Sequence, residues 1–287
     1  MIISKEIKII REILGKTQTE LAEELGVTFE TINRWELDKN DVEDRNVEKV
    51  YNYAFSKRIY LNNIYEQFLI EENQLEYNKV LFHGCKVNQI TFPISFNYSK
   101  DTNDFGVGFY LGESFKQAAA YISNTNSSSV YIFNFYTKDL NIGKYFVNKD
   151  WMLTIAYYRG WLKKYENNNY IKKLVKRAES VDLIIAPIAD NRMFDLISEY
   201  VRGEITDLQC EHALAATNLG YQYVLRTDKS LKCLTLLKCC YVSNKEKNSY
   251  LKERLDKNNI GMDKVKVARI EYRGKGQYID EFLKWES

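Results

Sequence analysis

The chain has 287 residues and a formal net charge of +2, which excludes a strong overall electrostatic attraction to nucleic acid or to a membrane. Five cysteines without a Cys-x-x-Cys pair favour reduced thiols, and two histidines are too few for a histidine-rich metal centre. The first residues become charged at once, and no apolar run approaches the roughly 20 residues needed to cross a bilayer. We therefore expect a cytoplasmic protein with no bound metal and no membrane partner.

Residues 1–60 are expected to form a compact helical domain, because apolar residues recur there at helical spacing. Thr17 followed three residues later by Glu20 is the pattern of a capping box, which begins a helix. Gly26 suits the turn after that helix. Thr28 is a good N-cap for the next helix.

The stretch from Gln18 to Glu36 resembles the helix-turn-helix of the phage-repressor-like (XRE, Cro/cI) family. The resemblance implies DNA binding through residues 17–36, with the second helix in the major groove. Repressor-like domains usually act as pairs, so the resemblance is compatible with a homodimer but does not fix the oligomeric state. The DNA-binding residues expected from it are Gln18, Thr28, Phe29, Glu30, Thr31, Asn33 and Arg34.

The charge of this domain favours a second interpretation. Residues 1–60 contain ten Lys and Arg against twelve Asp and Glu, which leaves little surplus to neutralise phosphates. The domain could therefore be a dimerisation or partner-binding module that has kept the repressor-like fold.

Beyond it, residues 61–77 predict a connecting helix, and residues 78–240 predict a second domain. Strands are expected near 79–82, 107–111, 130–136, 181–187, 221–226 and 231–237, and helices near 114–122, 151–165, 171–178, 192–202 and 206–216. The fold class is therefore α+β, with strands in the core and helices outside. An extension of unknown role, 241–287, is expected to hold a helix over 245–257, a strand over 265–272, a hairpin turn at Gly274 and Gly276, and a short final helix.

Three stretches of the second domain contain residues that could bind a ligand or take part in a reaction. An apolar strand ends in His83-Gly84. In Asp104–Leu111, two glycines precede Tyr110 and allow a tight turn and close approach of a ligand. A late strand, Gly220–Leu225, contains Gln222.

In this order the three stretches resemble the NAD-binding core of the ADP-ribosyltransferases, in the branch of diphtheria-toxin-like enzymes and poly(ADP-ribose) polymerases. The resemblance covers roughly residues 78–240 and implies a split β-sandwich with peripheral helices. It implies that His83 bonds a ribose hydroxyl, that the Gly84 backbone reaches the nicotinamide amide, and that Tyr110 stacks on the ring. The expected NAD-binding residues are His83, Gly84, Gly108, Tyr110 and Tyr121, and the expected catalytic residues are His83, Tyr110 and Gln222.

Gln222 departs from this family, which has Glu at that position. Cleavage of NAD passes through a positively charged, oxocarbenium-like transition state, as glycoside cleavage does. A glutamine can accept a hydrogen bond from the ribose but brings no charge, a loss of about 1–3 kcal/mol. Its presence favours transfer of one ADP-ribose unit, slow NAD hydrolysis, or no chemistry.

Two functions follow from the sequence. The first is a mono-ADP-ribosyltransferase that acts on an unknown acceptor as a toxin, antiphage effector or regulator, with DNA or an inhibitory partner protein on its helical domain. The second is a DNA-binding transcriptional regulator whose weak or inactive transferase-like domain senses NAD or another nucleotide. The three catalytic candidates also have structural interpretations. His83 could be a strand-end histidine whose hydrogen bonds are made within the protein, Tyr110 could be a core residue, and Gln222 could be an ordinary strand residue.

Overall fold

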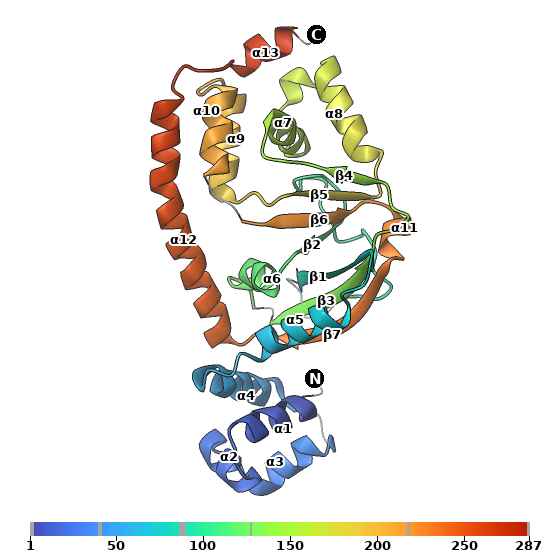
Figure 1. Cartoon of the computed structure of the whole chain (residues 1–287), viewed down its shortest axis with the longest axis vertical. Coiled ribbons are helices and arrows are strands. Elements are labelled where there is room, and N and C mark those ends of the chain that lie inside the picture. The colour runs from blue at the N-terminus through green and yellow to red at the C-terminus, as the bar shows by residue number, and fades with distance from the viewer. Residues whose placement is uncertain (1–2, 40–41, 86–89, 127, 217–218, 286–287) are drawn as a thin grey trace.

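The computed structural model describes residues 3–39, 42–85, 90–126, 128–216 and 219–285 (Figure 1). Short helices gather at the N-terminal end, and a β-sheet with its covering helices forms the rest. Helix α12 (Asn244–Glu271) runs along one side, from the helical domain to the far end of the sheet domain (Figure 1). None of the described helices combines the length and apolar character needed to span a membrane.

The N-terminal domain contains α1 (Ser4–Ile13), α2 (Gln18–Leu25), α3 (Phe29–Glu36) and α4 (Asp44–Ser56), which share one apolar cluster. The predicted capping box is present: Thr17 Oγ1 accepts a bond from the Glu20 N–H, and the Glu20 carboxylate accepts one from the Thr17 N–H at 2.7 Å. Gly26 ends α2 with φ +58°, and Thr28 caps α3. The local sequence signals are therefore confirmed.

Helix α4 fixes the helical domain to the sheet domain through polar contacts. Glu48 Oε2 accepts a hydrogen bond from the Tyr241 hydroxyl at 2.7 Å, and Glu48 Oε1 accepts one from the Asn244 N–H at 3.0 Å. Asn52 Oδ1 accepts another from the Lys245 N–H at 3.1 Å. These contacts set the orientation of the two domains.

The next helix, α5 (Leu61–Glu72), packs on the sheet domain, as expected for the connecting segment. Asn62 Nδ2 donates to the Tyr241 carbonyl and to Glu246 Oε2, both at 2.8 Å. Glu66 Oε1 accepts a hydrogen bond from the Phe115 N–H at 2.8 Å. Helix α5 thus holds one edge of the sheet, the start of α12 and the start of α6 (Phe115–Ile122) together.

The sheet has seven strands in the order β4-β5-β6-β2-β1-β3-β7, antiparallel except for the parallel pair β4–β5. Strands β1 and β3 pair along the whole of β1, whereas β1 and β2 are joined only at Phe82 and Gly112. The sheet is therefore split between β1 and β2. The strands are β1 (Asn78–Cys85), β2 (Phe109–Gly112), β3 (Ser129–Tyr136), β4 (Ile142–Lys144), β5 (Leu183–Pro187), β6 (Tyr221–Leu225) and β7 (Leu234–Tyr241).

One face of both halves contributes to a shared apolar cluster, with Leu81 and Phe133 from one half and Leu183 and Leu225 from the other. Helices cover the opposite face. Helix α6 packs on β1 and β3, while α7 (Lys149–Tyr158), α8 (Asn169–Glu179), α9 (Asn191–Val201) and α10 (Asp207–Ala215) belong to the core of the other half. The structure is thus a mixed α/β domain behind N-terminal helices.

The C-terminal region corrects one expectation. Residues 265–272 are not a strand, because α12 continues to Glu271. Val265 and Ala268 are buried three positions apart, while Val267 and Ile270 are 61% and 77% exposed. The apparent alternation was therefore one face of a helix, at helical spacing. The glycines that follow join α12 to α13 (Ile279–Trp285) and do not form a hairpin.

Smaller differences concern strand ends. Strand β2 begins at Phe109 rather than at 107, and a short helix, α11 (Asp228–Leu231), precedes β7, which begins at Leu234 rather than 231. The expected helix over 151–165 ends at Tyr158 and is followed by a 3-10 turn, Lys163–Tyr165. The short strand β4, at the sheet edge, was not predicted.

Candidate functional site

The fold brings the three candidate catalytic residues to adjacent strands at the split of the sheet. His83 is on β1, Tyr110 on β2 and Gln222 on β6, and these strands are neighbours in the order β6-β2-β1. Tyr110 pairs with Val224 and Gly112 pairs with Gln222. Residues far apart in sequence therefore lie on neighbouring strands in the centre of the sheet.

The register also decides which faces these residues occupy. Paired residues and residues two apart share a face, so Tyr110, Gln222 and Gly84 lie on the helix-covered side. His83 lies on the opposite side, where its ring stacks on Phe109 with centroids 4.5 Å apart. The candidate set therefore surrounds the split from both faces.

His83 is held by one specific contact. Its Nδ1 lies 2.7 Å from the Tyr110 carbonyl oxygen, which can only accept, so Nδ1 carries the proton. In a neutral ring Nε2 is then an acceptor, and among the described residues it has no hydrogen-bond partner. Burial lowers the pKa of His83, which favours this neutral form.

Tyr110 anchors the loop before β2. Its hydroxyl donates to the Gly106 carbonyl at 2.7 Å and accepts a bond from the Phe105 N–H at 3.2 Å. Burial raises the pKa of Tyr110, so the phenol stays protonated. Arg226 Nη1 donates to the carbonyls of Phe105 and Val107 from the end of β6. The phenol predicted to stack on nicotinamide thus also has a structural function.

Gln222 is almost buried, with 8% of its surface exposed, and its amide meets a carboxylate. Gln222 Nε2 donates to Asp104 Oδ2 at 3.1 Å and to the Pro187 carbonyl at 3.2 Å. Asp104 Oδ1 in turn accepts a bond from Arg159 Nη2 at 2.6 Å. Sequence reasoning missed Asp104 and Arg159. Asp104 begins the motif that contains Tyr110, but Arg159 is 55 residues from it and carries no local signal.

The glycines of the motifs meet packing requirements. A side-chain Cβ at Gly84 would lie 2.2 Å from the Ala118 carbonyl oxygen, so the close approach of α6 requires glycine there. At Gly108 a Cβ would lie 2.6 Å from Val224 Cγ1 of β6. Tyr121, on α6, is 57% exposed and is thus accessible from solvent.

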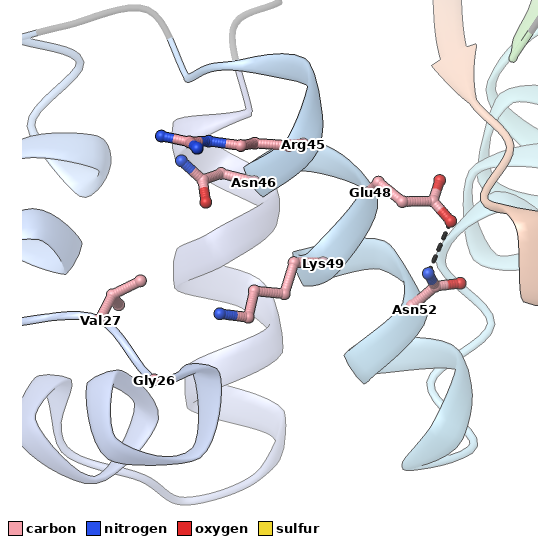
Figure 2. Close-up of a pocket in the computed structure, with 7 residues that line it drawn as sticks. All are labelled: Gly26, Val27, Arg45, Asn46, Glu48, Lys49 and Asn52. Carbon is pink, nitrogen blue, oxygen red and sulfur yellow. Dashed lines mark hydrogen bonds between the residues drawn. The ribbon is translucent and has the colours of Figure 1, made fainter.

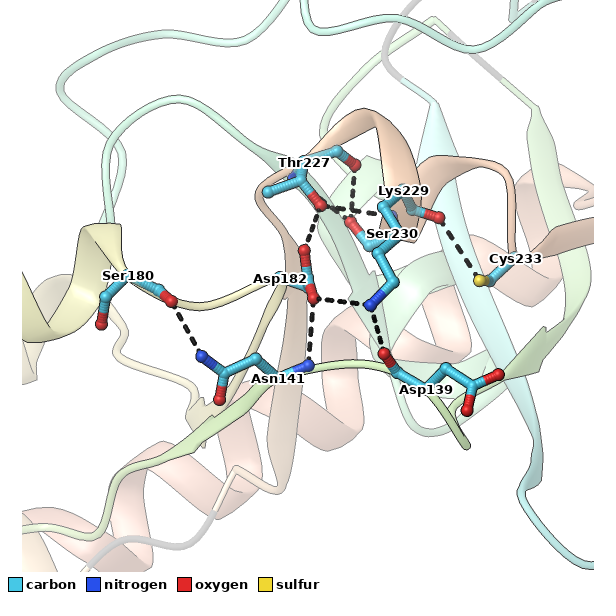
Figure 3. Close-up of polar contacts among 8 residues, drawn as sticks. All are labelled: Asp139, Asn141, Ser180, Asp182, Thr227, Lys229, Ser230 and Cys233. Carbon is cyan, nitrogen blue, oxygen red and sulfur yellow. Dashed lines mark hydrogen bonds and ion pairs between the residues drawn. The ribbon is translucent and has the colours of Figure 1, made fainter.

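A polar cluster around Asp182 holds the C-terminal end of β6, the end away from Gln222 (Figure 3). Asp182 Oδ1 accepts a bond from Thr227 Oγ1 at 2.7 Å, and its Oδ2 accepts one from the Asn141 N–H at 3.0 Å. The Lys229 ammonium group lies 3.4 Å from Oδ2. Together these partners lower the pKa of Asp182, with the Asn141 N–H as the largest cause. The cluster joins the starts of β4 and β5 to the end of β6, next to Arg226.

The predicted DNA-binding residues lie mostly on the surface. Thr28, Phe29, Glu30 and Arg34 are exposed, and Thr31 and Asn33 are half-buried, so α3 presents a free polar face. Gln18 is different. Its amide donates to Glu36 Oε2 at 2.8 Å, and Glu36 also pairs with Arg11, so Gln18 is part of the fold of the domain.

Beside the turn between α2 and α3 lies a groove with basic side chains from α4. It is lined by Gly26, Val27, Arg45, Asn46, Glu48, Lys49 and Asn52. Figure 2 shows Arg45, Asn46 and Lys49 pointing to the Gly26–Val27 side of α4, whereas Glu48 and Asn52 point away from it and bond each other. Helix α4 therefore has a basic side and a side that docks on the sheet domain.

Two further polar residues of the sheet domain have structural functions. His212 stacks on Tyr272 of the C-terminal region, with ring centroids 3.6 Å apart. Asp190 caps α9 by accepting a bond from the Met193 N–H at 3.0 Å.

Comparison with known families divides the chain in the same way as its structure. Residues 79–236 match a family described as "Protein of unknown function (DUF3990)". Residues 7–51 match a family described as "Helix-turn-helix". No significant match was found among curated proteins or among solved structures.

Proposed function

The chain belongs to the DUF3990 family, and we propose that its sheet domain is a NAD-dependent mono-ADP-ribosyltransferase. The observation that carries this proposal is the placement of His83, Tyr110 and Gln222 on three neighbouring strands, β1, β2 and β6, beside the split of the sheet. His83 and Tyr110 match the motifs of the ADP-ribosyltransferases, and Gln222 stands where that family has Glu. NAD is the substrate, and the acceptor is unknown.

The split offers suitable contacts to a dinucleotide. Beyond Phe82, β1 is not paired with β2, so the edge of β1 at Gly84 can exchange backbone hydrogen bonds with the carboxamide of nicotinamide. His83 Nε2 can accept a bond from a ribose hydroxyl. Tyr121, on the helix that packs on β1, has an exposed ring, and aromatic stacking contributes about 0.5–1.5 kcal/mol beyond burial.

The reaction breaks the bond between ribose C1′ and the nicotinamide nitrogen. The bonding electron pair leaves with nicotinamide, which becomes neutral, and the positive charge passes to C1′ and the ring oxygen of the ribose. A lone pair of the acceptor then bonds C1′, and the acceptor releases a proton to water. Gln222 Oε1 can accept a ribose hydroxyl proton in a hydrogen bond, but it cannot act as a strong base. Transfer of a single unit is therefore favoured over polymer extension.

The test is release of nicotinamide from NAD by the purified protein, together with Gln222→Ala and His83→Ala. We expect slow release that falls at least about tenfold in both variants. NAD binding without release would favour the alternative, a transferase-like domain that senses NAD. Absence of both binding and release would contradict the proposal.

The N-terminal helix-turn-helix suggests DNA binding, and a specific observation favours it as a second function. The face of α3 is exposed, and the basic side of α4 lies beside the turn that precedes α3. We propose that this domain brings the transferase to DNA or binds a partner protein that restrains it, as in a toxin, an antiphage effector or a regulator. Loss of toxicity in cells expressing His83→Ala in place of the wild-type protein would support such a harmful activity.

A further inference from the structure

The positive charge that develops on the ribose needs a negative charge near it, and Gln222 has none. A carboxylate nevertheless touches its amide. Asp104 Oδ2 is 3.1 Å from Gln222 Nε2, and Asp104 is itself 8% exposed. We propose that Asp104 supplies the negative charge of this site by acting through Gln222, as its positioning residue. This inference rests on the proposed transferase function.

The two partners of Gln222 determine how its amide is oriented. Asp104 Oδ2 and the Pro187 carbonyl are both acceptors, so the group between them must be the NH₂ of the amide. Gln222 Oε1, the only acceptor of the side chain, is then directed away from both. Glutamine is held with its oxygen available for a donor such as a ribose hydroxyl.

The two oxygens of the Asp104 carboxylate have different partners. Arg159 Nη2 bonds Oδ1 at 2.6 Å, and its guanidinium group lies over the ring of Phe194, 3.7 Å from the centroid. Oδ2 remains for Gln222. Because hydrogen bonds in series polarise one another where water is excluded, the carboxylate strengthens Gln222 Oε1 as an acceptor. The series Asp104–Gln222–ribose hydroxyl can thus stabilise the charge on C1′ as the bond to nicotinamide breaks.

A purely structural function of Asp104 would be to hold the loop before β2. That loop has other anchors, because Arg226 bonds the Phe105 and Val107 carbonyls and Tyr110 bonds Gly106. We therefore expect Asp104→Asn to fold. Moving the charge from residue 104 to residue 222 separates the two functions, since a loop anchor would not be replaced by a charge elsewhere.

The experiment compares wild type, Asp104→Asn and the double variant Asp104→Asn/Gln222→Glu by nicotinamide release, NAD affinity and melting temperature. Asp104→Asn should lower kcat about tenfold or more and change the dissociation constant of NAD less than about threefold. The double variant places the carboxylate on residue 222, where an amide at residue 104 can donate to it although the bond to the Pro187 carbonyl is lost, and should raise kcat well above that of Asp104→Asn. Asp101→Asn, an exposed residue of the same loop, is the control and should leave kcat unchanged.

A kcat of Asp104→Asn equal to that of wild type would overturn the inference. If Asp104→Asn does not fold, the double variant decides: a folded, active double variant supports the inference, and a folded, inactive one overturns it. Failure of the proposed function has a different signature, because wild type itself then releases no nicotinamide, and the inference fails with it.

Discussion

The His83 imidazole donates from Nδ1 to the Tyr110 carbonyl oxygen at 2.7 Å, across the gap between β1 and β2. The backbones of these strands pair only at Phe82 and Gly112. One step further along, a side chain therefore replaces the ladder hydrogen bond that the strands would otherwise share. The same ring both joins the two halves of the sheet at the split and leaves Nε2 directed away from that bond.

We predict that asparagine and alanine at position 83 have different effects. The Nδ2 of asparagine takes nearly the place of the imidazole Nδ1, so His83→Asn keeps the bond to the Tyr110 carbonyl but lacks an equivalent of Nε2. His83→Ala loses both and should lower the free energy of unfolding by about 1–3 kcal/mol, because it leaves a carbonyl without its partner. Urea denaturation should show Asn close to wild type and Ala well below it, while both variants lose nicotinamide release.

The pH dependence of stability offers a second measurement at the same residue. Burial lowers the pKa of His83 in the folded protein, so the unfolded chain binds a proton first as the pH falls below about 6.5. Stability should therefore decrease as the pH falls below about 6.5, and this component should be absent in His83→Asn. His212→Asn removes the exposed second histidine and serves as the control. An identical pH dependence in His83→Asn and wild type would contradict the prediction.

Glu246, at the junction of the two domains, should make stability fall as the pH rises, which is the opposite of the pH dependence expected from His83. It is 4% exposed, it accepts bonds from Asn62 Nδ2 at 2.8 Å and Tyr250 hydroxyl at 3.0 Å, and burial raises its pKa from 4.5 to about 7. Between these values the unfolded chain is ionised while the folded protein keeps its proton, so stability falls as the pH rises. Glu246→Gln removes this titration and should gain on wild type by about 2–3 kcal/mol between pH 5 and pH 8.

Chemical denaturation at both pH values measures this difference. Glu72→Gln, an exposed glutamate at the end of α5, should show no such pH-dependent gain. If Glu246→Gln loses stability relative to wild type at pH 8, the Glu246 carboxyl is ionised in the folded protein and the interpretation of its burial is wrong.

Short-range signals predicted much of the fold. The capping box at Thr17 and Glu20 and the left-handed Gly26 involve residues three or four apart, so sequence alone locates them. The apolar residues of β1, β2 and β6 also identified these stretches as strands. The split of the sheet could not be predicted, because it depends on which strands become neighbours after folding.

The contacts of the candidate site could not be predicted from the sequence either, because they join residues that are far apart along the chain. Gln222 and Asp104 are 118 residues apart, and their bond needs β6, β5 and the loop before β2 to be in place together. The glycines were interpreted as openings for a ligand, whereas Gly84 and Gly108 also make room for α6 and β6. Residues 265–272 were misassigned because a short helical face and an alternating strand place apolar residues similarly over few positions.

Asp182 should stabilise the end of β6 near neutral pH. Its pKa is lowered by the Asn141 N–H and the Thr227 hydroxyl, so its contribution is present above about pH 4 and is lost as the pH falls through the folded value. Asp182→Asn should lower the free energy of unfolding by about 1–3 kcal/mol at pH 7, and this difference should shrink at low pH. Thermal denaturation at pH 7 and pH 3 tests this, with exposed Asp263→Asn as control. A pH-independent difference would argue that the carboxylate charge is irrelevant.

Lys49 should contribute to DNA binding through charge alone. It lines the groove beside Gly26, it is exposed, and among the described residues it makes no ion pair, whereas Arg45 is paired with Glu43 at 2.7 Å. Each phosphate contact releases counterions, so Lys49→Ala should weaken binding to a mixed-sequence duplex and reduce the slope of log K against log salt concentration by about one. Fluorescence anisotropy over a salt series measures this slope. Lys266→Ala, on α12 and paired with Asp263, should leave the slope unchanged. Equal slopes for wild type and Lys49→Ala would mean that DNA, if bound, does not lie along the groove, and α3 would then have to meet it from another direction.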